Sequence, residues 1–376
     1  MRSVIIYRDR LLPLSETFIR SQVRSMTRFR GVYAGCRRIP GLDLSGNPAV
    51  ILRGKRFGGV RETIFKELGR ANNFVKELKQ YEPSLLHAHF GPDGAVALPL
   101  AQSLNIPMVV TFHGFDANLT NEAFRETRWG KRYLRHRDAL KKDGAQFIAV
   151  SDFIARRLIR QGFPADKVHV HYIGVDTDHF QCCTDRKRED IVLFVGRLVE
   201  KKGCEHLVRA MANVQRSVPD CGLIIIGDGP LRSELESLAI SQLRKFRFLG
   251  AQPEDVVKDW MAKAAVFCGP SVVAKSGDAE GFGIVFIEAQ ASGLPVVSFA
   301  SGGIPEAVAH GVTGYLAPEK DVGALSNYLV ELLQDDATRM KFSRAGRERV
   351  KNRFDLKVQT AKLEQIYEET LAGAIA

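Results

Sequence analysis

The sequence has few of the features that mark secreted, metal-binding or membrane-spanning proteins. Its six cysteines, in 376 residues, form no C-x-x-C pair and no zinc-like spacing, which indicates reduced thiols. The adjacent Cys182 and Cys183 are interpreted as a coincidental pair in a linker, with a strained redox disulfide as the alternative. No apolar run approaches the length of a transmembrane helix, and MRSVIIYRDR reaches Arg8 and Asp9 too soon for a signal peptide. The expected compartment is the cytoplasm.

Motifs for nucleic-acid recognition are also missing, although the charge is uneven. Residues 1–180 hold 29 Lys and Arg against 17 Asp and Glu, a net charge of +12, whereas the remaining 196 residues hold 25 against 26. This asymmetry predicts an anionic partner for the first half. Without a helix-turn-helix or an aromatic and basic RNP-like stretch, an anionic membrane or a lipid pyrophosphate fits better than nucleic acid. An ordinary soluble basic face is the alternative.

The length and the patterning predict an α/β protein with two domains. Strand-like and helix-like segments alternate throughout, which is typical of doubly wound, Rossmann-like parallel sheets. We predict domains over 1–180 and 181–355, joined by a linker over 174–190, with a C-terminal helix over 356–376 that returns to the first domain. The strands expected are 3–7, 84–88, 108–112, 146–150, 167–171, 191–195, 222–226, 246–249, 266–268, 295–299 and 314–316. The main helices expected are 15–28, 61–80, 94–104, 122–141, 152–160, 323–350 and 356–371.

The most informative segment runs from Ser271 to Gly314. It contains Glu280 and Glu288, separated by seven residues around a Gly-Phe-Gly turn, and it reads as loop, helix, turn and strand. Glycines let backbone N–H groups approach a ligand, and a helix start offers unpaired donors at a positive dipole end, so the turn suits phosphate or sugar oxygens. The alternative is two solvated acids. Against it, the apolar neighbours of Glu288 predict a mostly buried helix, where an acid needs partners.

This segment, with the stretch GRLVEKKG from Gly196 to Gly203, resembles the retaining glycosyltransferases of family 4, which have the two-domain GT-B fold. The resemblance covers essentially the whole C-terminal half. It implies that Glu280 contacts the donor sugar, that Glu288 holds the ribose hydroxyls of the nucleotide, and that Arg197 and Lys202 bind the diphosphate. The other donor-binding residues predicted are Gly281, Phe282, Gly283 and Ile284. The resemblance also implies two domains that face each other across a cleft. It implies that no metal is needed and that there is no cofactor, since the nucleotide sugar is a substrate.

The first half contributes a second group of candidates. His113 follows a predicted strand, and the resemblance assigns it to contacts near the reacting end of the donor sugar, so His113 and Glu280 are the predicted catalytic residues. Asp116 is expected to orient His113 or to meet the acceptor. The sequences HAH from His87 and HVH from His169 each place two imidazoles on one side of a strand. No third metal ligand is placed by the sequence, so they are interpreted as packing or cleft-lining residues, and only His89 is kept as an acceptor candidate.

One segment departs from the family pattern. Many relatives have a glycine-rich loop after the first strand, whereas this chain has RDRLLPLSETF from Arg8 to Phe18. The LSETF part is similar to bacterial exopolysaccharide and lipopolysaccharide members. Ser15, Glu16 and Thr17 are therefore acceptor candidates, with an ordinary first-turn acid as the alternative for Glu16.

Together these features predict a retaining hexosyltransferase that moves a sugar from a UDP- or GDP-linked donor to a lipid-linked or polysaccharide precursor in bacterial cell-surface polysaccharide biosynthesis. The enzyme is expected on the inner face of the cell membrane, held by its basic first domain, with no nucleic-acid partner. Two alternatives stay open. One is a sugar-nucleotide epimerase or hydrolase of the same fold, and the other is a non-catalytic basic membrane-surface scaffold.

Overall fold

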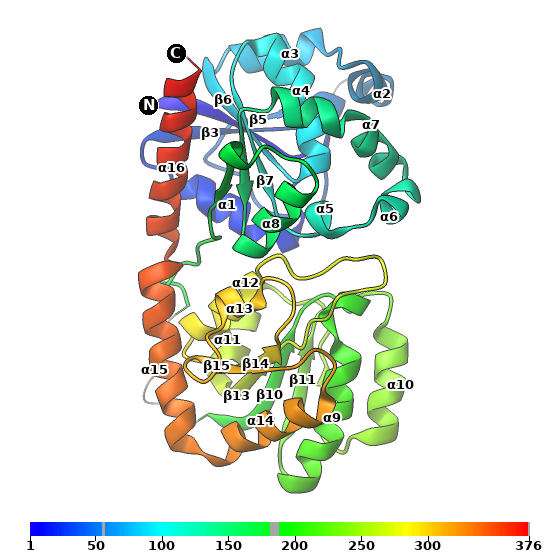
Figure 1. Cartoon of the computed structure of the whole chain (residues 1–376), viewed down its shortest axis with the longest axis vertical. Helices are drawn as coiled ribbons and strands as arrows, with labels where there is room; N and C mark the ends of the chain where they lie inside the picture. The colour runs from blue at the N-terminus through cyan, green and yellow to red at the C-terminus, as the bar shows by residue number, and fades with distance from the viewer. Residues whose placement is uncertain (55–56, 181–187, 375–376) are drawn as a thin grey trace. The chain divides into compact units, whose positions relative to one another are not determined.

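The computed structural model describes residues 1–54, 57–180 and 188–374 and divides the chain into two compact units (Figure 1). The first unit comprises Met1–Gly174 and Leu356–Ala376, and the second comprises Val175–Asp355. The second unit thus begins six residues before the boundary predicted from the sequence. The reason is that Val175 N–H donates to the carbonyl of Phe354 at 2.8 Å, which ties this segment to the end of the second unit. The predicted cysteine pair at 182–183 lies outside the described residues.

The first unit is built on a seven-stranded parallel sheet with the order β5-β3-β1-β6-β7-β8-β9. Its strands are β1 Arg2–Tyr7, β3 Phe29–Gly35, β5 Ala49–Ile51, β6 Pro83–His89, β7 Met108–Phe112, β8 Gln146–Ala149 and β9 Val168–Val170. A separate short pair joins β2 Arg10–Leu11 to β4 Arg37–Arg38. The longer helices are α1 Thr17–Arg24, α2 Gly58–Leu68, α3 Asn72–Lys79, α4 Gly91–Leu104, α7 Arg128–Asp143, α8 Asp152–Arg160 and α16 Leu356–Gly373. Short helical turns are η1 Leu14–Glu16, η2 Leu52–Gly54, α5 Phe115–Asn118, α6 Asn121–Arg125 and η3 Ala165–Lys167.

Three predicted helices of this unit are shorter than expected. The segment 61–80 forms α2 and α3, because Gly69 adopts a left-handed φ of 67° that ends α2. The segment 122–141 forms α6 and α7, because Thr127 caps α7 by accepting a hydrogen bond from Gly130 N–H. The helix expected over 15–28 covers only Thr17–Arg24, and Ser15 lies in the preceding 3-10 turn η1.

The C-terminal helix α16 completes the first unit. Glu364, which is 1% exposed, accepts hydrogen bonds from the backbone N–H groups of Thr27, Arg28 and Phe29 at 2.7–3.0 Å. These donors are the residues over which α1 was expected to continue. Their hydrogen bonds to a side chain 335 or more positions away explain why the chain leaves the helix and enters β3, a strand that the sequence did not predict.

The second unit has a six-stranded parallel sheet with the order β12-β11-β10-β13-β14-β15. Its strands are β10 Glu189–Val195, β11 Gly222–Ile226, β12 Phe246–Phe248, β13 Ala264–Cys268, β14 Val296–Phe299 and β15 Gly314–Ala317. The helical segments are η4 Glu200–Lys202, α9 Cys204–Ser217, α10 Arg232–Gln242, α11 Glu254–Lys263, α12 Ile284–Ala291, α13 Ile304–Ala307, α14 Val322–Gln334 and α15 Asp336–Arg353. The helix expected over 323–350 is two helices, because Asp335 caps α15 by accepting from Thr338 N–H.

Both sheets reverse their strand order at one point, between β1 and β6 in the first unit and between β10 and β13 in the second. Ligands of open α/β sheets bind beyond the C-terminal ends of strands at such a point. The prediction of two doubly wound, Rossmann-like domains is confirmed, and the sheet order directs attention to the loops that follow these strands. In the part of the chain that the structure describes, the helices are all too short or too polar to traverse a bilayer.

Candidate active site

Loops that follow β10, β11 and β12 pack backbone against backbone in the second unit. Gly196 N–H donates to the carbonyl of Ile226 at 2.9 Å, and Gly227 N–H donates to the carbonyl of Gly250 at 2.8 Å. Gly227 has a φ of 139°, and a Cβ at this position would lie 1.9 Å from the Gly196 oxygen, so glycine is required. Arg197 comes directly after this contact and is exposed. It has no ion-pair partner among the described residues.

Lys202 and Glu280, 78 positions apart, form an ion pair with the lysine Nζ 2.5 Å from the carboxylate Oε2. Their side chains are only 18% and 12% exposed. Beside them, Lys201 Nζ lies 3.0 Å from Asp278. The two segments are joined through the backbone, since Val272 N–H donates to the carbonyl of Lys201 at 2.8 Å. The result is a cluster of two cations and two carboxylates at the end of β10.

The turn at residues 302–303 fixes the backbone of Glu280. Gly303 N–H donates to the Glu280 carbonyl at 2.9 Å, and a Cβ on Gly302, whose φ is 58°, would lie 2.4 Å from the same oxygen. Burial would raise the pKa of the Glu280 carboxyl, but the ammonium groups of Lys202 and Lys201 outweigh it and hold the pKa below its ordinary value. Glu280 is therefore ionised at neutral pH.

The turn from Gly281 to Gly283 leads into α12. Gly283 is the N-cap residue of α12 and has a φ of 84°. A Cβ at this position would lie 2.4 Å from a ring carbon of Phe286. Phe282 is 1% exposed and packs edge-on against Phe354, with 5.2 Å between the ring centroids, so its ring belongs to the core of the unit. Ile284 opens the helix and is half-buried. The first N–H groups of α12 have no intrahelical acceptor, which suits an anion.

Glu288 lies on α12, which is mostly buried, as predicted. Burial raises the pKa of its carboxyl to about 8, the carboxylate of Glu254 acts in the same direction, and Lys202 opposes both. At neutral pH the group is therefore mainly a neutral carboxylic acid, which can both donate and accept a hydrogen bond. Glu280 and Glu288 thus differ in charge although both are partly buried.

The first unit brings His89, at the end of β6, against His113, which follows β7. Nδ1 of His89 and Nε2 of His113 lie 3.0 Å apart, and the two rings stack with centroids 5.3 Å apart. The other ring nitrogen of each is buried without a hydrogen-bond partner among the described residues. Both rings line a cavity of about 20 Å³, which Phe18 and His171 also line. Burial lowers the pKa of both imidazoles well below the ordinary value, so both are neutral at pH 7.

Asp116 is completely buried and holds the loop that carries His113. Its carboxylate accepts hydrogen bonds from the backbone N–H groups of Gly91, His113 and Gly114 at 2.9–3.0 Å. Burial raises the pKa of this carboxyl to about 6, and these N–H groups act against the shift. Of the two roles predicted for Asp116, this geometry favours orientation of His113.

Glu16 is paired within its own unit. Its carboxylate lies 2.8 Å from Arg8 Nη2 and 3.0 Å from Arg8 Nε, and the same guanidinium donates to Asp93 at 2.5 Å. The guanidinium also lies 4.4 Å from the centroid of the Phe90 ring. Glu16 lies in the turn η1 and is the N-cap residue of α1, without a side-chain cap hydrogen bond. Arg8 occupies its carboxylate and the residue is 6% exposed, so an acceptor contact of Glu16 stays a prediction. Its neighbours Ser15 and Thr17 are exposed and half-buried, respectively.

The other histidines of the HAH and HVH sequences are hydrogen-bonded to protein groups. His87 lies between the Tyr367 hydroxyl, at 2.6 Å, and the Thr111 hydroxyl, at 2.7 Å. His171 Nε2 lies 2.7 Å from the carbonyl of Gln359. Across the described ranges, no cluster of three or more histidine, cysteine or acidic side chains has the arrangement of a metal site.

Sequence reasoning missed four side chains that shape these sites, namely Arg8, Asp93, Asp278 and Glu254. Arg8 had a usable signal, since a cation directly follows the first strand. Asp278 lies two residues before Glu280, but its pairing with Lys201 depends on a loop conformation. Asp93 and Glu254 gave no signal, because their partners are distant in sequence.

Comparisons with known proteins identify the family of the chain. The family described as Glycosyl transferases group 1 matches residues 177–349, and the family described as Glycosyltransferase Family 4 matches residues 23–179. The amylovoran biosynthesis glycosyltransferase AmsK of Erwinia amylovora is 30% identical over 296 residues, which cover 77% of this chain and 71% of AmsK.

Two further comparisons concern a lipid-modifying enzyme and a solved structure. The GDP-mannose-dependent monoacylated alpha-(1-6)-phosphatidylinositol monomannoside mannosyltransferase of Corynebacterium glutamicum is 32% identical over 247 residues, which cover 61% of this chain and 64% of that enzyme. The structure of Anabaena HepE in complex with UDP and glucose matches with a TM-score of 0.80 at 20% identity, over 98% of this chain and 100% of HepE. This likeness establishes the fold, which is of the GT-B class.

Proposed function

We propose that this chain, which belongs to the family 4 glycosyltransferases, moves a sugar with retention of configuration from a UDP- or GDP-linked donor to a lipid-linked or polysaccharide precursor of bacterial cell-surface polysaccharide. That the chain is a glycosyltransferase follows from the family matches over residues 23–179 and 177–349. The observation that carries the finer proposal is the ion pair between Lys202 and the ionised Glu280, beside the N-terminus of α12.

The donor diphosphate would bind between cations and backbone donors. Arg197 is exposed, and its planar guanidinium can form paired hydrogen bonds with phosphate oxygens, whereas Lys202 acts as a point charge. The N–H groups that open α12 add a third set of donors. We assign the ribose hydroxyls to Glu288, because a neutral carboxylic acid can donate to one hydroxyl and accept from another. Relatives support either nucleotide, since HepE was solved with UDP and the mannosyltransferase is named for GDP-mannose.

The proposed reaction is a front-face substitution. The acceptor hydroxyl oxygen forms a bond to the anomeric carbon as the bond from that carbon to the diphosphate oxygen breaks, and the electron pair stays on the diphosphate. The hydroxyl proton passes to the departing oxygen on the same face, so configuration is retained and no protein nucleophile is used. Arg197 and Lys202 stabilise the negative charge that develops on the diphosphate. Glu280, kept anionic by Lys202, contacts the sugar.

His113 would hydrogen-bond the donor sugar near its reacting end. Its neutral imidazole has one nitrogen hydrogen-bonded to His89, and the other has no hydrogen-bond partner among the residues that the structure describes, so we assign this second nitrogen to a sugar hydroxyl. The stacked His89 ring fixes the orientation of His113, and Asp116 fixes its backbone. Among the acceptor candidates, Ser15 and Thr17 retain accessible side chains.

We further propose that the enzyme needs no metal and works as a peripheral protein at the inner face of the cell membrane. The cationic side chains near Glu280 supply the charge that the departing diphosphate requires. The basic first half, with a net charge of +12 over residues 1–180, would face anionic lipid. AmsK is named for an exopolysaccharide pathway, and the mannosyltransferase for a phosphatidylinositol acceptor, which supports a lipid-linked or glycan acceptor here.

Thermal-shift measurements with a panel of UDP and GDP sugars come first, because a ligand at 100 times its Kd stabilises a protein by about 2.7 kcal/mol. Nucleotide release is then measured with and without a membrane extract as the acceptor source, with and without EDTA. Release that depends on the extract and resists EDTA, with an α-linked product from an α-linked donor, is the expected result. Release without acceptor would indicate a hydrolase, interconversion of sugar nucleotides an epimerase, and no donor binding a scaffold. A trapped covalent sugar–enzyme adduct would refute the front-face reaction.

A further inference from the structure

Helix α2 exposes a row of aliphatic side chains. Val60, Ile64 and Leu68 are 60%, 39% and 65% exposed, and they recur every four residues. At about 3.6 residues per turn, this spacing keeps all three on one narrow face of the helix. Phe57, directly before the helix, is 68% exposed. We call Val60, Ile64 and Leu68 the α2 stripe.

The opposite face of α2 is anchored in the first unit. Phe65 is 1% exposed and packs edge-on against Tyr7 and Phe74, with ring centroids 6.4 and 5.9 Å away. Glu62 is 4% exposed, and its carboxylate accepts hydrogen bonds from Arg37 at 2.7 Å and from Lys66 at 2.8 Å. The helix therefore has a buried face of its own, and the α2 stripe is a second apolar face that the core of the unit does not use.

A strongly basic pocket of about 560 Å³ lies beside α2. Its charged lining comprises seven cations and two carboxylates: Arg10, Arg37, Lys66, Arg128, Lys131, Arg132, Arg135, Glu62 and Glu67. Within the described ranges, Arg10, Arg128 and Lys131 have no carboxylate partner, and all three are exposed. We call this the basic pocket. Its unbalanced charge suits a ligand that carries several negative charges.

Helix α2 carries the α2 stripe and also contributes Glu62, Thr63, Lys66 and Glu67 to the lining of the basic pocket. Glu67, between Ile64 and Leu68 in sequence, pairs with Arg132 and, at 3.4 Å, with Arg135 of α7. Trp129, at the start of α7, also lines the pocket and is 40% exposed. Indole rings prefer the boundary between apolar and wet surroundings.

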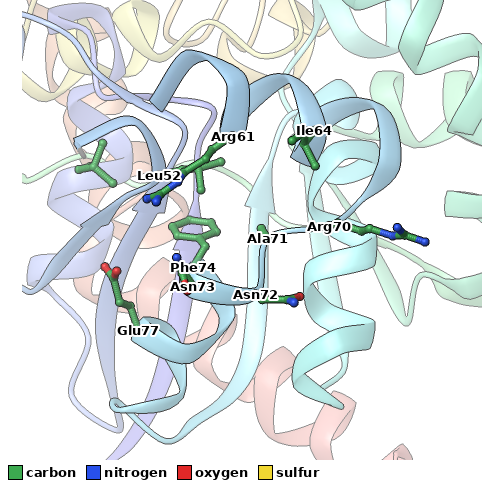
Figure 2. A pocket seen from close by; sticks show the side chains of 10 residues that line it. Leu52, Arg61, Ile64, Arg70, Ala71, Asn72, Asn73, Phe74 and Glu77 are labelled. Atoms are coloured by element: carbon green, nitrogen blue, oxygen red, sulfur yellow. The ribbon is translucent and has the colours of Figure 1, made fainter. Parts of the chain in front are cut away.

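A second pocket, of about 370 Å³, is lined by Ile64 of the stripe and by residues of α2 and α3 (Figure 2). Figure 2 labels Arg61 and Arg70 among its lining residues, together with the buried Leu52 and Phe74. Neither arginine has a carboxylate partner in the part of the chain that the structure describes. Ile64 of the α2 stripe thus shares this second pocket with two cations.

We propose that the α2 stripe and the basic pocket dock the first unit on an anionic phospholipid bilayer, with the aliphatic side chains in the interface and lipid phosphate groups in the pocket. The α2 stripe and the basic pocket would bind different parts of one phospholipid bilayer. Exposed aliphatic side chains gain from contact with acyl chains, while unpaired cations gain from lipid phosphates. A soluble polyanion would satisfy the basic pocket but not the stripe. This inference deepens the proposed function, because it assigns the surface by which the enzyme would meet its membrane.

Co-sedimentation of the full chain with vesicles tests the proposal. The protein should bind vesicles of phosphatidylglycerol and phosphatidylcholine, and bind phosphatidylcholine vesicles more weakly by about tenfold or more. The stripe variant, Val60→Ser with Ile64→Ser and Leu68→Ser, and the pocket variant, Arg10→Ala with Arg128→Ala and Lys131→Ala, should each lose about tenfold in affinity for the anionic vesicles. Only the binding of the pocket variant should become less sensitive to salt.

Matched controls come from the second unit. Ile240→Ser removes an aliphatic side chain that is 72% exposed on α10, and Arg216→Ala with Arg244→Ala removes two cations from another surface pocket. Both should bind vesicles like the wild type. Trp129 supplies a direct signal, since the chain has two tryptophans and Trp260→Phe leaves Trp129 alone. Its fluorescence should shift to shorter wavelength on anionic vesicles.

Several results would overturn the proposal. These are equal binding to both vesicle types, wild-type binding by both the stripe and the pocket variants, or binding of inorganic pyrophosphate at the pocket without vesicle binding. The last outcome would assign the pocket to a soluble anion. Sugar-nucleotide thermal shifts are measured on the same proteins without lipid and should be unchanged in both variants. Vesicle binding without a nucleotide shift would contradict the proposed function alone, and a nucleotide shift without vesicle binding would contradict this inference alone.

Discussion

The ammonium group of Lys202 lies 2.5 Å from a carboxylate oxygen of Glu280, and the two side chains are 18% and 12% exposed. Glu280 is thereby ionised, while Glu288, eight residues later on α12, has a pKa of about 8 and is mainly neutral at pH 7. The two acids therefore suit different partners. An anion beside cations suits a polarised sugar, and a neutral acid suits hydroxyl groups that both donate and accept.

Glu280→Gln should lower kcat by about 100-fold while the Kd for the sugar nucleotide changes by less than about threefold, because the anion acts on the reacting sugar. Lys202→Met should weaken donor binding by about tenfold or more, since it removes a diphosphate contact. Steady-state kinetics and thermal shift separate the two effects. Lys351→Met, which removes an exposed cation on α15, is the control for loss of a positive charge. Equal and negligible effects of Glu280→Gln and Lys202→Met would contradict the site.

Glu288→Gln should change how stability depends on pH. The folded protein keeps the Glu288 proton up to about pH 8, whereas the unfolded chain releases it near 4.5. Between these values the folded state binds more protons, so the wild-type free energy of unfolding falls as pH rises, by up to about 1.4 kcal/mol per pH unit. The glutamine variant lacks this pH dependence. At pH 8.5 its free energy of unfolding, measured with urea, should therefore be higher than that of the wild type. Glu348→Gln, exposed on α15, is the control, and identical pH slopes for wild type and Glu288→Gln would refute the assignment.

His113→Asn should lower kcat by about tenfold or more if the imidazole hydrogen-bonds the transferred sugar. The pKa of His113 lies well below 6.5, so the unfolded chain takes up a proton near pH 6.5 that the folded chain does not. The free energy of unfolding therefore falls as pH drops below 6.5, and the variant should show a shallower fall. His169→Asn, on β9, is the control for kcat. Wild-type kcat in His113→Asn would rule out the proposed contact.

Glu16→Gln should destabilise the protein by about 1.5 to 3 kcal/mol, because the largely buried Arg8 loses one of its two carboxylate partners and keeps Asp93. Ser15→Ala should leave the melting temperature nearly unchanged, since its side chain is exposed, and raise KM for the acceptor. Calorimetry and acceptor titrations distinguish a structural acid from an acceptor contact. A stable Glu16→Gln variant with a raised acceptor KM would reverse the two assignments.

Gly302→Ala should lower kcat by about tenfold or more with little change in donor affinity, because its Cβ would press on the Glu280 carbonyl from 2.4 Å and displace the carboxylate that acts on the sugar. Gly311→Ala is a close control. Its φ of 70° is similarly left-handed, but a Cβ there meets nothing within 4 Å, so it should cost only about 1 kcal/mol of stability. Both variants place an alanine in a left-handed conformation, but only the alanine at position 302 collides with another residue. Equal effects of the two variants on kcat would refute the role of this turn.

The alternation of strands and helices was predictable from the sequence because it reflects local periodicity. The segments 108–112 and 222–226 have the predicted bounds, as does the helix over 152–160. Errors came where a distant residue or a single turn decided the outcome. Glu364 ends the segment expected as a long first helix, and Gly69 divides the second. The segment from Glu280 to Glu288 was prominent in sequence because its turn, helix and acids are contiguous.

By itself, the sequence determined the α/β class, the family and the identity of the acids and cations around Gly283, because these depend on local patterns and on a contiguous motif. Only the tertiary structure decided the charge state of those acids. Lys202 lowers the pKa of Glu280, while burial and Glu254 raise that of Glu288. The tertiary structure also buries Glu16, which pairs with Arg8, and it leaves the α2 stripe exposed. Desolvation and Coulomb interactions depend on distances between residues far apart in the chain, and folding sets those distances.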